Sequence, residues 1–334
     1  MTGAASALAV LGLAACSQAK DEATEDAAAA SEEVATTKEA TVDIQPIDSP
    51  IITELAYRTY HICEYGMDSI FYVEGDDRAV LIDTGTGVFD IPAFVAQHFG
   101  DKPYDVILTH GHVDHAGGMF QFDKVYLNEA DWELALGNTV EERQGYVDIM
   151  ISQSGGIYQL SPDMVMAGAD IDAEKPEFLP LNEGDTFDLG GRMLEVFFTP
   201  GHTAGSVSFL DRDNRIIFTG DCCNTNTLLT PFSGGEEDAG ADQCISGLKA
   251  TAEKLQGLHD AFDRNVNGHV GYARWLTFQS VPDAVIPECI KLCQDILDGM
   301  VEGEEATGFG GNPCRIAKSE TGVMQIQYYD WQVK

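Results

Sequence analysis

One short stretch of this sequence concentrates side chains that bind metal ions. It reads Thr109-His110-Gly111-His112-Val113-Asp114-His115, with three imidazoles and one carboxylate in six consecutive positions. Imidazole and carboxylate suit zinc and tolerate iron or manganese. His110 and His112 are two residues apart, so an extended backbone would point both rings to the same side. His115 follows on the predicted turn, and we expect it to face a second ion.

Three further donors lie far along the chain, each beside a glycine and after an apolar, strand-like run. They are His202, Asp221 and His269. Glycine lets the backbone turn sharply at a strand end while the neighbouring side chain points into a cleft. With the first stretch they make five histidines and two aspartates, which is too many donors for one tetrahedral zinc. The set predicts two ions that share a carboxylate and a hydroxide.

The order of these motifs resembles that of the metallo-β-lactamase-fold hydrolases. The family's HxHxDH motif is matched by His110, His112, Asp114 and His115, and its later ligands by His202, Asp221 and His269. Residues 200–206, Pro-Gly-His-Thr-Ala-Gly-Ser, are most similar to the glyoxalase II and lactonase branches. The resemblance covers residues 52–269, and four separated motifs agree with it.

This resemblance implies a role for each donor. His110, His112 and His202 would hold the first ion, Asp114, His115 and His269 the second, and Asp221 would bridge them. Asp83, which follows the apolar run 79–82, would orient a ligand by hydrogen bonding, although a strand-end aspartate can also cap a turn. We expect Cys222 to be a buried thiol. The remaining histidines, His61, His98 and His259, are expected to lie outside the site.

Apolar runs that read as strands end just before the donors. Residues 69–73 and 79–82 predict a hairpin, and residues 206–210 and 215–218 predict a second hairpin that leads to Asp221. Strands are also predicted at 104–108 before His110, at 124–127, at 193–198 before His202, at 265–266 before His269, and at 323–329. Helices are predicted at 129–136, 245–255 and 281–300.

Strand pairs mixed with helices suggest two sheets with helices outside. This agrees with the α+β class and the αββα sandwich that the resemblance implies, in which two mixed sheets face each other and the metals sit at one edge between them. Residues 137–180 and 224–242 read as insertions that overhang the site and shape the substrate pocket. We expect one catalytic domain over residues 51–334.

Composition excludes some partners. The 334-residue chain has a formal net charge of −36, whereas binding to a nucleic acid backbone needs a basic surface. The same charge disfavours attraction to anionic lipid. Seven cysteines remain when Cys16 is set aside, an odd number that cannot pair completely, and sequence alone does not give their pairing.

The N-terminus resembles a bacterial lipoprotein signal. Residues 1–16 form an apolar run, too short to span a bilayer, that ends in Leu13-Ala14-Ala15-Cys16. Signal peptides begin with basic residues, and no Lys or Arg precedes this run. Residues 17–50 are acidic and poor in large apolar side chains, which predicts a disordered tether. We therefore expect an exported protein, lipid-anchored at Cys16 to the cell envelope.

The predicted activity is hydrolysis of an acyl bond in a small-molecule substrate. Two ions would lower the pKa of a water from about 15.7 toward about 7, and the resulting hydroxide would attack a carbonyl carbon. The resemblance suggests that Asp114 orients the nucleophile or carries its proton. Carboxylic esters, thioesters and lactones all fit this chemistry, and Asp221 as a bridging ligand favours the thioester and lactone branches.

Two alternatives stay open. Export favours an external substrate, which keeps a β-lactamase as the first alternative. The second is an iron-dependent oxidoreductase of the same fold. The diiron members of the family usually carry a glutamate where this chain has His112, and usually a flavin-binding domain, and neither feature is found in this sequence.

Overall fold

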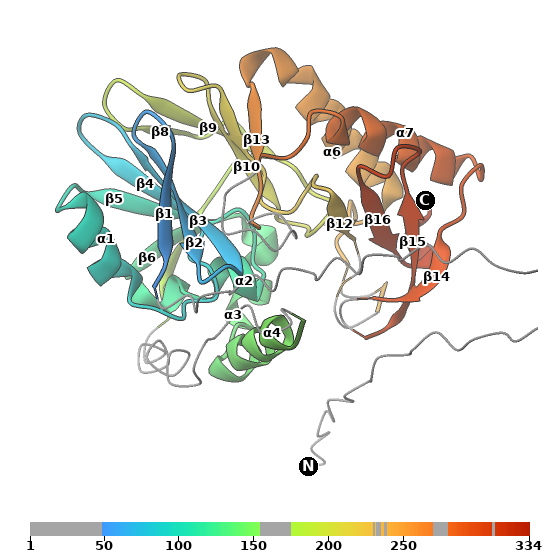
Figure 1. Ribbon diagram of the computed structural model, residues 1–334, viewed down its shortest axis with the longest axis horizontal. Helices are drawn as coiled ribbons and strands as arrows, with labels where there is room; N and C mark the ends of the chain where they lie inside the picture. Colours follow the sequence, from blue (N-terminus) through green and yellow to red (C-terminus); the bar gives the residue numbers. More distant parts are fainter. Residues whose placement is uncertain are drawn as a thin grey trace, which may run out of the picture. The chain divides into compact units, whose positions relative to one another are not determined.

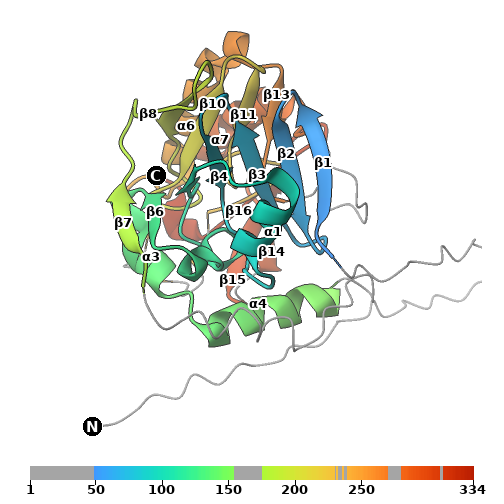
Figure 2. The same cartoon turned by 90° about the vertical axis from the view of Figure 1, so that its left-hand side faces the viewer.

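A seven-stranded mixed sheet carries the first half of the candidate site. In the computed structural model of Figure 1 its strands lie in chain order: β1 (Ile51–Ala56), β2 (Thr59–Glu64), β3 (Asp68–Glu74), β4 (Ala79–Ile82), β5 (Tyr104–Ile107), β6 (Lys124–Leu127) and β7 (Glu177–Pro180). Strands β1 to β4 pair antiparallel and β4 to β7 pair parallel. The predicted hairpin of β3 and β4 is confirmed. Figure 2 shows α1 (Ile91–Phe99), the crossover from β4 to β5, in front of this sheet.

A five-stranded sheet faces it. The order is β13 (Arg264–Val266), β11 (Ile216–Phe218), β10 (Val207–Asp211), β9 (Met193–Phe198) and β8 (Thr186–Asp188). Strands β11 and β13 pair parallel, and the other neighbouring strands of this sheet pair antiparallel. Apolar side chains from both sheets fill the space between them, as when the ring of Phe71 on β3 meets that of Phe218 on β11 at 5.0 Å. Helices cover the outer faces: α1 packs on the first sheet, and α6 (Ile245–Gly257) and α7 (Val285–Leu297) on the second. The predicted αββα layering is confirmed.

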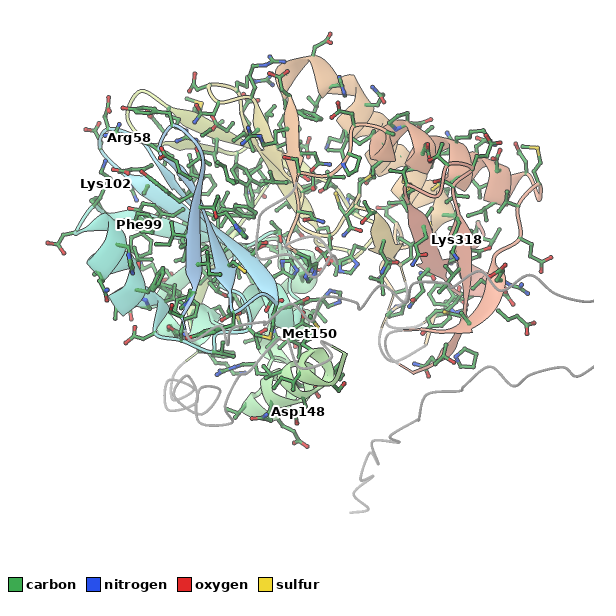
Figure 3. The ribbon with its side chains drawn as sticks, viewed as in Figure 1. Arg58, Phe99, Lys102, Asp148, Met150 and Lys318 are labelled. Carbon is green, nitrogen blue, oxygen red and sulfur yellow. The ribbon has the colours of Figure 1, made fainter. Side chains whose placement is uncertain are left out.

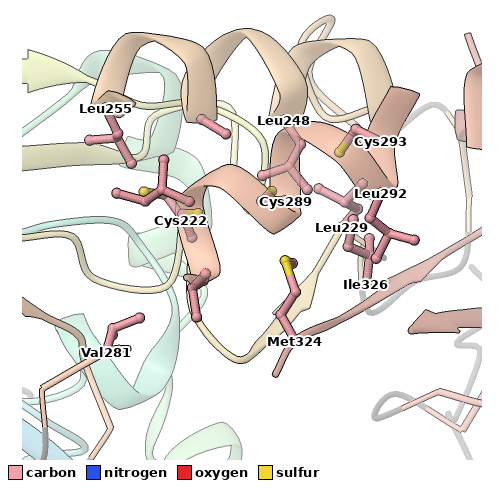
Figure 4. Close-up of a cluster of buried hydrophobic side chains, with 14 of the residues drawn as sticks. Cys222, Leu229, Leu248, Leu255, Val281, Cys289, Leu292, Cys293, Met324 and Ile326 are labelled. Carbon is pink, nitrogen blue, oxygen red and sulfur yellow. The ribbon is translucent and has the colours of Figure 1, made fainter. Parts of the chain in front are cut away.

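A third sheet was not predicted. Its order is β12 (Asn226–Leu228), β16 (Gln325–Tyr328), β15 (Pro313–Lys318) and β14 (Glu304–Thr307). Met324 and Ile326 pack against α6 and α7, where Cys289 and Cys293 share the buried face of α7, as Figure 4 shows. The predicted final strand is β16. The sheet and α7 are thereby fixed to the same core as the five-stranded sheet.

The two predicted insertions contain regular structure. Residues 137–180 include α4 (Val140–Gln153) and, in β7, an edge strand of the first sheet. On α4, Met150 packs toward the core while Asp148 points to solvent (Figure 3). Residues 224–242 include β12. Segments whose own periodicity is weak thus hold a helix and strands, because tertiary pairing orders them.

Short helices complete the connections. They are α2 (Val113–Ala116), α3 (Trp132–Leu136), and the 3-10 turns η1 (Met119–Gln121), η2 (Glu129–Asp131), η5 (His259–Ala261) and η6 (Asp330–Gln332). The structure describes residues 49–153, 175–229, 231, 235–236, 239–269, 280–308 and 311–334, all of which belong to one compact unit, Ile44–Lys334. The predicted signal segment and residues 17–48 of the predicted tether lie outside the described residues. Among the described helices, none is both long and apolar enough to cross a bilayer.

Candidate metal centre

The predicted donors meet at one edge of the two facing sheets. His110 follows β5, and His112, Asp114 and His115 lie at the start of α2. His202, Asp221 and His269 follow β9, β11 and β13. Their ligand atoms fall into two groups, each within 4.8 Å: His110, His112 and His202 in one, and Asp114, His115, Asp221 and His269 in the other. These groups correspond to the ligand sets that the family resemblance implied.

The three imidazoles of the first group point at one another. His112 Nδ1 lies 3.1 Å from His110 Nε2 and 2.8 Å from His202 Nε2. Tetrahedral zinc with Zn–N distances of about 2.0–2.1 Å would separate its ligand nitrogens by about 3.3 Å, close to this spacing. Burial, followed by the charge of His202, lowers the pKa of His112 to about 3. Burial likewise holds the pKa of His110 well below its usual value. Both rings are therefore neutral, which is the form that binds metal.

The ring of His202 has a fixed tautomer. Its Nδ1 lies 2.6 Å from the carbonyl oxygen of Leu228 on β12. A carbonyl oxygen only accepts, so Nδ1 carries the proton and donates it. In the neutral ring, Nε2 then presents a lone pair to His110 and His112. This is the arrangement that a metal-binding histidine needs.

The second group holds buried atoms without a partner. His115 Nδ1 donates to Asp83 Oδ2 at 2.9 Å, which leaves its Nε2 facing Asp221 Oδ1 at 3.7 Å and Asp114 Oδ2 at 3.8 Å. Within the described residues, His115 Nε2 and Asp221 Oδ1 are buried and make no hydrogen bond. Burial opposes a charge on His115, but the carboxylates of Asp114, Asp83 and Asp221 outweigh it and raise the pKa of His115 to about 9. The carboxylates thus stabilise a cation at this point, and the donor set fits a divalent ion.

Asp221 lies between the two groups. Its Oδ2 is 2.9 Å from His269 Nε2 and 3.9 Å from His202 Nε2, and its Oδ1 faces His115. Burial alone would raise the pKa of Asp221, yet the charges of His269 and His115 hold it far below its usual range. A permanently ionised carboxylate that reaches both groups is the arrangement expected of a bridging ligand.

Asp83 orients the site from behind. Its carboxylate accepts from Thr109 N at 2.7 Å and Thr109 Oγ1 at 2.8 Å, in addition to His115. Asp83 is fully buried and has a φ of 61°, a left-handed conformation that costs free energy in a non-glycine residue. Through these hydrogen bonds, Asp83 holds the ring of His115 in place relative to the segment before His110.

Two glycines leave room for the ligands. A Cβ on Gly268 would lie 2.0 Å from His115 Cε1 and 2.9 Å from Asp221 Oδ1. Gly220 has a φ of +51°, and a Cβ there would lie 2.6 Å from Thr109 Oγ1. The glycines noted beside the donors are therefore required by close packing of the site as well as by the turn.

Asp131 is a site residue that the sequence did not reveal. Its carboxylate accepts from Gly111 N at 2.9 Å, Gly205 N at 2.7 Å and Thr203 Oγ1 at 2.6 Å. It thereby joins the loop of His110 and His112 to the loop of His202. Burial raises the pKa of Asp131 against the effect of these hydrogen bonds. In the sequence, it is indistinguishable from an aspartate that caps a helix.

A buried acidic pair lies behind His269. Asp68 Oδ1 is 3.9 Å from His269 Nδ1 and accepts from the hydroxyl of Tyr146 on α4 at 2.9 Å. Glu64 accepts from the backbone amides of residues 86–88. Burial, followed by the charge of Asp68, raises the pKa of Glu64 well above its usual value. Through Tyr146, part of the predicted 137–180 insertion does reach the surroundings of the site.

The residues that were expected to play no part lie outside both groups. Cys222 is fully buried in the core around α6 and α7, and burial raises the pKa of its thiol to about 12. His61 is buried and its Nε2 bonds Ser69 Oγ at 2.9 Å. Neither His98 nor His259 belongs to a group of described residues that could hold a metal.

The comparisons with known proteins identify the class. The sequence profile of the metallo-beta-lactamase superfamily matches residues 65–230. The chain belongs to this superfamily of metallo-hydrolases.

Individual relatives are more informative. The chain is 31% identical over 206 residues to acyl-coenzyme A thioesterase MBLAC2 of Homo sapiens, covering 58% of this chain and 68% of that protein. It is 26% identical over 169 residues to the probable metallo-hydrolase YqgX of Bacillus subtilis, covering 50% of this chain and 72% of that one. A solved double mutant of the sec-alkyl sulfatase PisA1 shares the fold, with a TM-score of 0.54 at 18% identity over 75% of this chain and 42% of that chain.

Proposed function

We propose that the protein is a metal-dependent hydrolase of acyl thioesters that uses two divalent ions, zinc foremost. The observation that carries this proposal is the position of Asp221 between two complete groups of donors. The similarity to a protein named as an acyl-coenzyme A thioesterase supports the thioester as substrate class. The wider set of esters and lactones has the same carbonyl chemistry, and the likeness of residues 200–206 to glyoxalase II and lactonases remains a prediction.

Each residue has a role in this proposal. His110, His112 and His202 would hold one ion, and Asp114, His115 and His269 the other, with Asp221 shared. Bound divalent ions supply an activated water and polarise a carbonyl oxygen. Asp83 and the carbonyl of Leu228 keep the rings of His115 and His202 in the tautomers that present Nε2.

Asp114 is suited to move a proton. Its side chain is 14% exposed, the highest value among the second group, so it can meet a substrate. Burial would raise the pKa of Asp114, but His115 and His269 outweigh it and keep this pKa below its usual value. An ionised Asp114 can accept the proton of the attacking water and pass it to the leaving sulfur as the C–S bond breaks.

A substrate panel tests the proposal. The metal-loaded protein is assayed with one acyl group presented as the coenzyme A thioester, the N-acetylcysteamine thioester and the ethyl ester, alongside a lactone and a β-lactam. We expect the thioesters to give the highest kcat/KM. A β-lactam or lactone turned over at least ten times faster than both thioesters would overturn the substrate class.

The net charge of the chain predicts a salt dependence of kcat/KM for a coenzyme A thioester. A net charge of −36 repels the phosphates of coenzyme A, so added salt should raise kcat/KM for that substrate. The N-acetylcysteamine thioester is uncharged and serves as the control, because salt should leave its kcat/KM nearly unchanged.

We also propose that the chain is exported and lipid-anchored at Cys16. The lipobox-like sequence Leu13-Ala14-Ala15-Cys16 supports this. A single lipid chain gives only marginal attachment, so a stable anchor needs more than one. Mass spectrometry of membrane-fraction protein should show a chain that begins at a lipidated Cys16. An intact, unmodified N-terminus on a cytoplasmic protein would reject the anchor.

A further inference from the structure

The strand that orients His202 belongs to the third sheet. Leu228, whose carbonyl accepts from His202 Nδ1, is the last residue of β12. β12 is the edge strand of this sheet and pairs parallel with β16, where Leu228 lies opposite Gln327. The amide of Leu229 then donates to the carbonyl of Gln327 at 2.9 Å. The segment that orients His202 is therefore hydrogen-bonded to residues near position 327, far from the other donors in the sequence.

Two buried glutamines strengthen this connection. Gln243 Nε2 donates to the carbonyl of His202 at 2.8 Å and to that of Leu229 at 3.1 Å. Gln332 Nε2 donates to the same carbonyl of Leu229 at 2.7 Å and to that of Gln243 at 2.9 Å. The two amides thus join the backbone of His202, the segment after β12 and the turn after β16 in one network.

Both glutamine side chains are buried, and each is hydrogen-bonded through its nitrogen and its oxygen. Gln332 is 0% exposed and Gln243 is 6% exposed. Gln332 Oε1 accepts from Tyr329 N at 2.8 Å, and Gln243 Oε1 accepts from Gly240 N at 3.2 Å. A buried amide with every partner in place restricts the backbone that it contacts, and its removal leaves buried carbonyls without donors.

We propose that Gln243 and Gln332 are positioning residues for the first metal group, and that the third sheet holds His202 in its ligating orientation through them. This inference rests on the proposed function, in which His202 is a metal ligand. Residues that orient a ligand typically change metal affinity by 10–100-fold when they are replaced. The second group receives no bond from either glutamine among the described contacts, so its affinity should change little.

The experiment measures each metal group alone. His269→Ala removes a donor of the second group and leaves the first, whereas His110→Ala does the reverse. Gln332→Met, which keeps the side-chain length but removes both donated bonds, is introduced into each background, and zinc affinity of the full chain is measured by competition with a chromophoric chelator. Gln243→Met is measured in the same way.

Tyr328→Phe is the matched control. Like Gln332, Tyr328 is buried. It lies on β16, and its hydroxyl accepts from Gly303 N at 2.9 Å, away from Leu229. It therefore reports any general loosening of the third sheet. Gln243→Met is the second variant in case Gln332→Met does not fold, because it removes a different part of the same network, the bonds to the carbonyls of His202 and Leu229.

A second readout needs no metal. Nitrogen NMR of histidine-labelled, metal-free protein reports which ring nitrogen of His202 carries the proton. We expect the Nδ1–H form in the unsubstituted chain and in Tyr328→Phe, and a mixture of the two forms in Gln332→Met.

The outcomes separate the inference from the proposed function. Affinity that falls 10–100-fold in the His269→Ala background and less than threefold in the His110→Ala background supports the inference. Equal losses in both backgrounds, or the same loss in Tyr328→Phe, would overturn it. If the unsubstituted chain binds no zinc, the proposed function fails, and an unchanged His202 tautomer in Gln332→Met would then reject the positioning role as well.

Discussion

Replacement of Asp131 should show whether this residue joins the two loops that carry metal ligands or merely caps a helix. Asp131→Ala leaves the amides of Gly111 and Gly205 and the hydroxyl of Thr203 without their acceptor. A buried group left unsatisfied costs about 1–3 kcal/mol, so three of them predict a loss of about 3–9 kcal/mol in the free energy of unfolding. Asp131→Asn keeps one acceptor oxygen and should lose less.

Asp90 offers a matched control. It also lies at a helix start, and its exposed carboxylate accepts from Ala93 N at 2.9 Å. Loss of such a cap costs about 1 kcal/mol. Urea unfolding of the metal-free variants gives the free energies, and chelator competition gives the metal affinities.

The comparison has a clear point of failure. Asp131→Ala should be less stable than Asp90→Ala by more than about 2 kcal/mol and should bind metal more weakly. A loss of that size is a large share of the stability of an ordinary domain, so Asp131→Asn keeps the test usable if the alanine variant does not fold. Equal stability and equal metal affinity in Asp131→Ala and Asp90→Ala would refute the reasoning, as would an Asp131→Asn variant that matches the unsubstituted chain in both.

Three further outcomes are expected. Elemental analysis of desalted protein should find two divalent ions per chain, and one ion or none after zinc addition would count against the two-ion site. Chelation should lower Tm, because the ions bind the folded state. Asp221→Ala should stay folded by circular dichroism, bind less metal and slow catalysis by orders of magnitude, whereas Cys222→Ser should keep close to the original activity. The reverse pattern would show that Cys222, and not Asp221, is the metal ligand. Burial, with the charge of Asp114, raises the pKa of Asp68 from 3.8 to about 6, so the folded state favours its protonated form. The unfolding free energy of the metal-free chain should therefore fall relative to Asp68→Asn as pH rises through that range, and a constant difference would contradict the shift.

Much of the site was readable from the sequence because its donors follow apolar strands. Runs such as 193–198 and 124–127 coincide with β9 and β6, and strand ends in facing sheets meet at one edge. The glycines beside the donors marked the close approach that Gly220 and Gly268 now show. Residue type and spacing therefore predicted the donors, and the family resemblance implied their division into two groups.

Other parts depend on contacts that leave no local pattern. β7 and β14 are short, largely exposed edge strands, and their neighbours rather than their own sequences make them strands. Asp131, Gln243 and Gln332 are ordinary polar residues in the sequence. Each becomes important because folding buries it beside backbone groups from a distant loop, and no spacing rule predicts such a meeting.

The parallel pairing of β12 with β16 has a consequence for how the chain acquires its metal during synthesis. Every donor has been added to the growing chain once His269 is made, yet β16 and the turn that follows it are translated later. Contacts between segments so distant in sequence form slowly, because a long loop must close first. A nascent chain that holds all its donors would thus carry an incompletely oriented His202 until β16 has paired with β12, and the first group would gain its full affinity only in that last stage of folding.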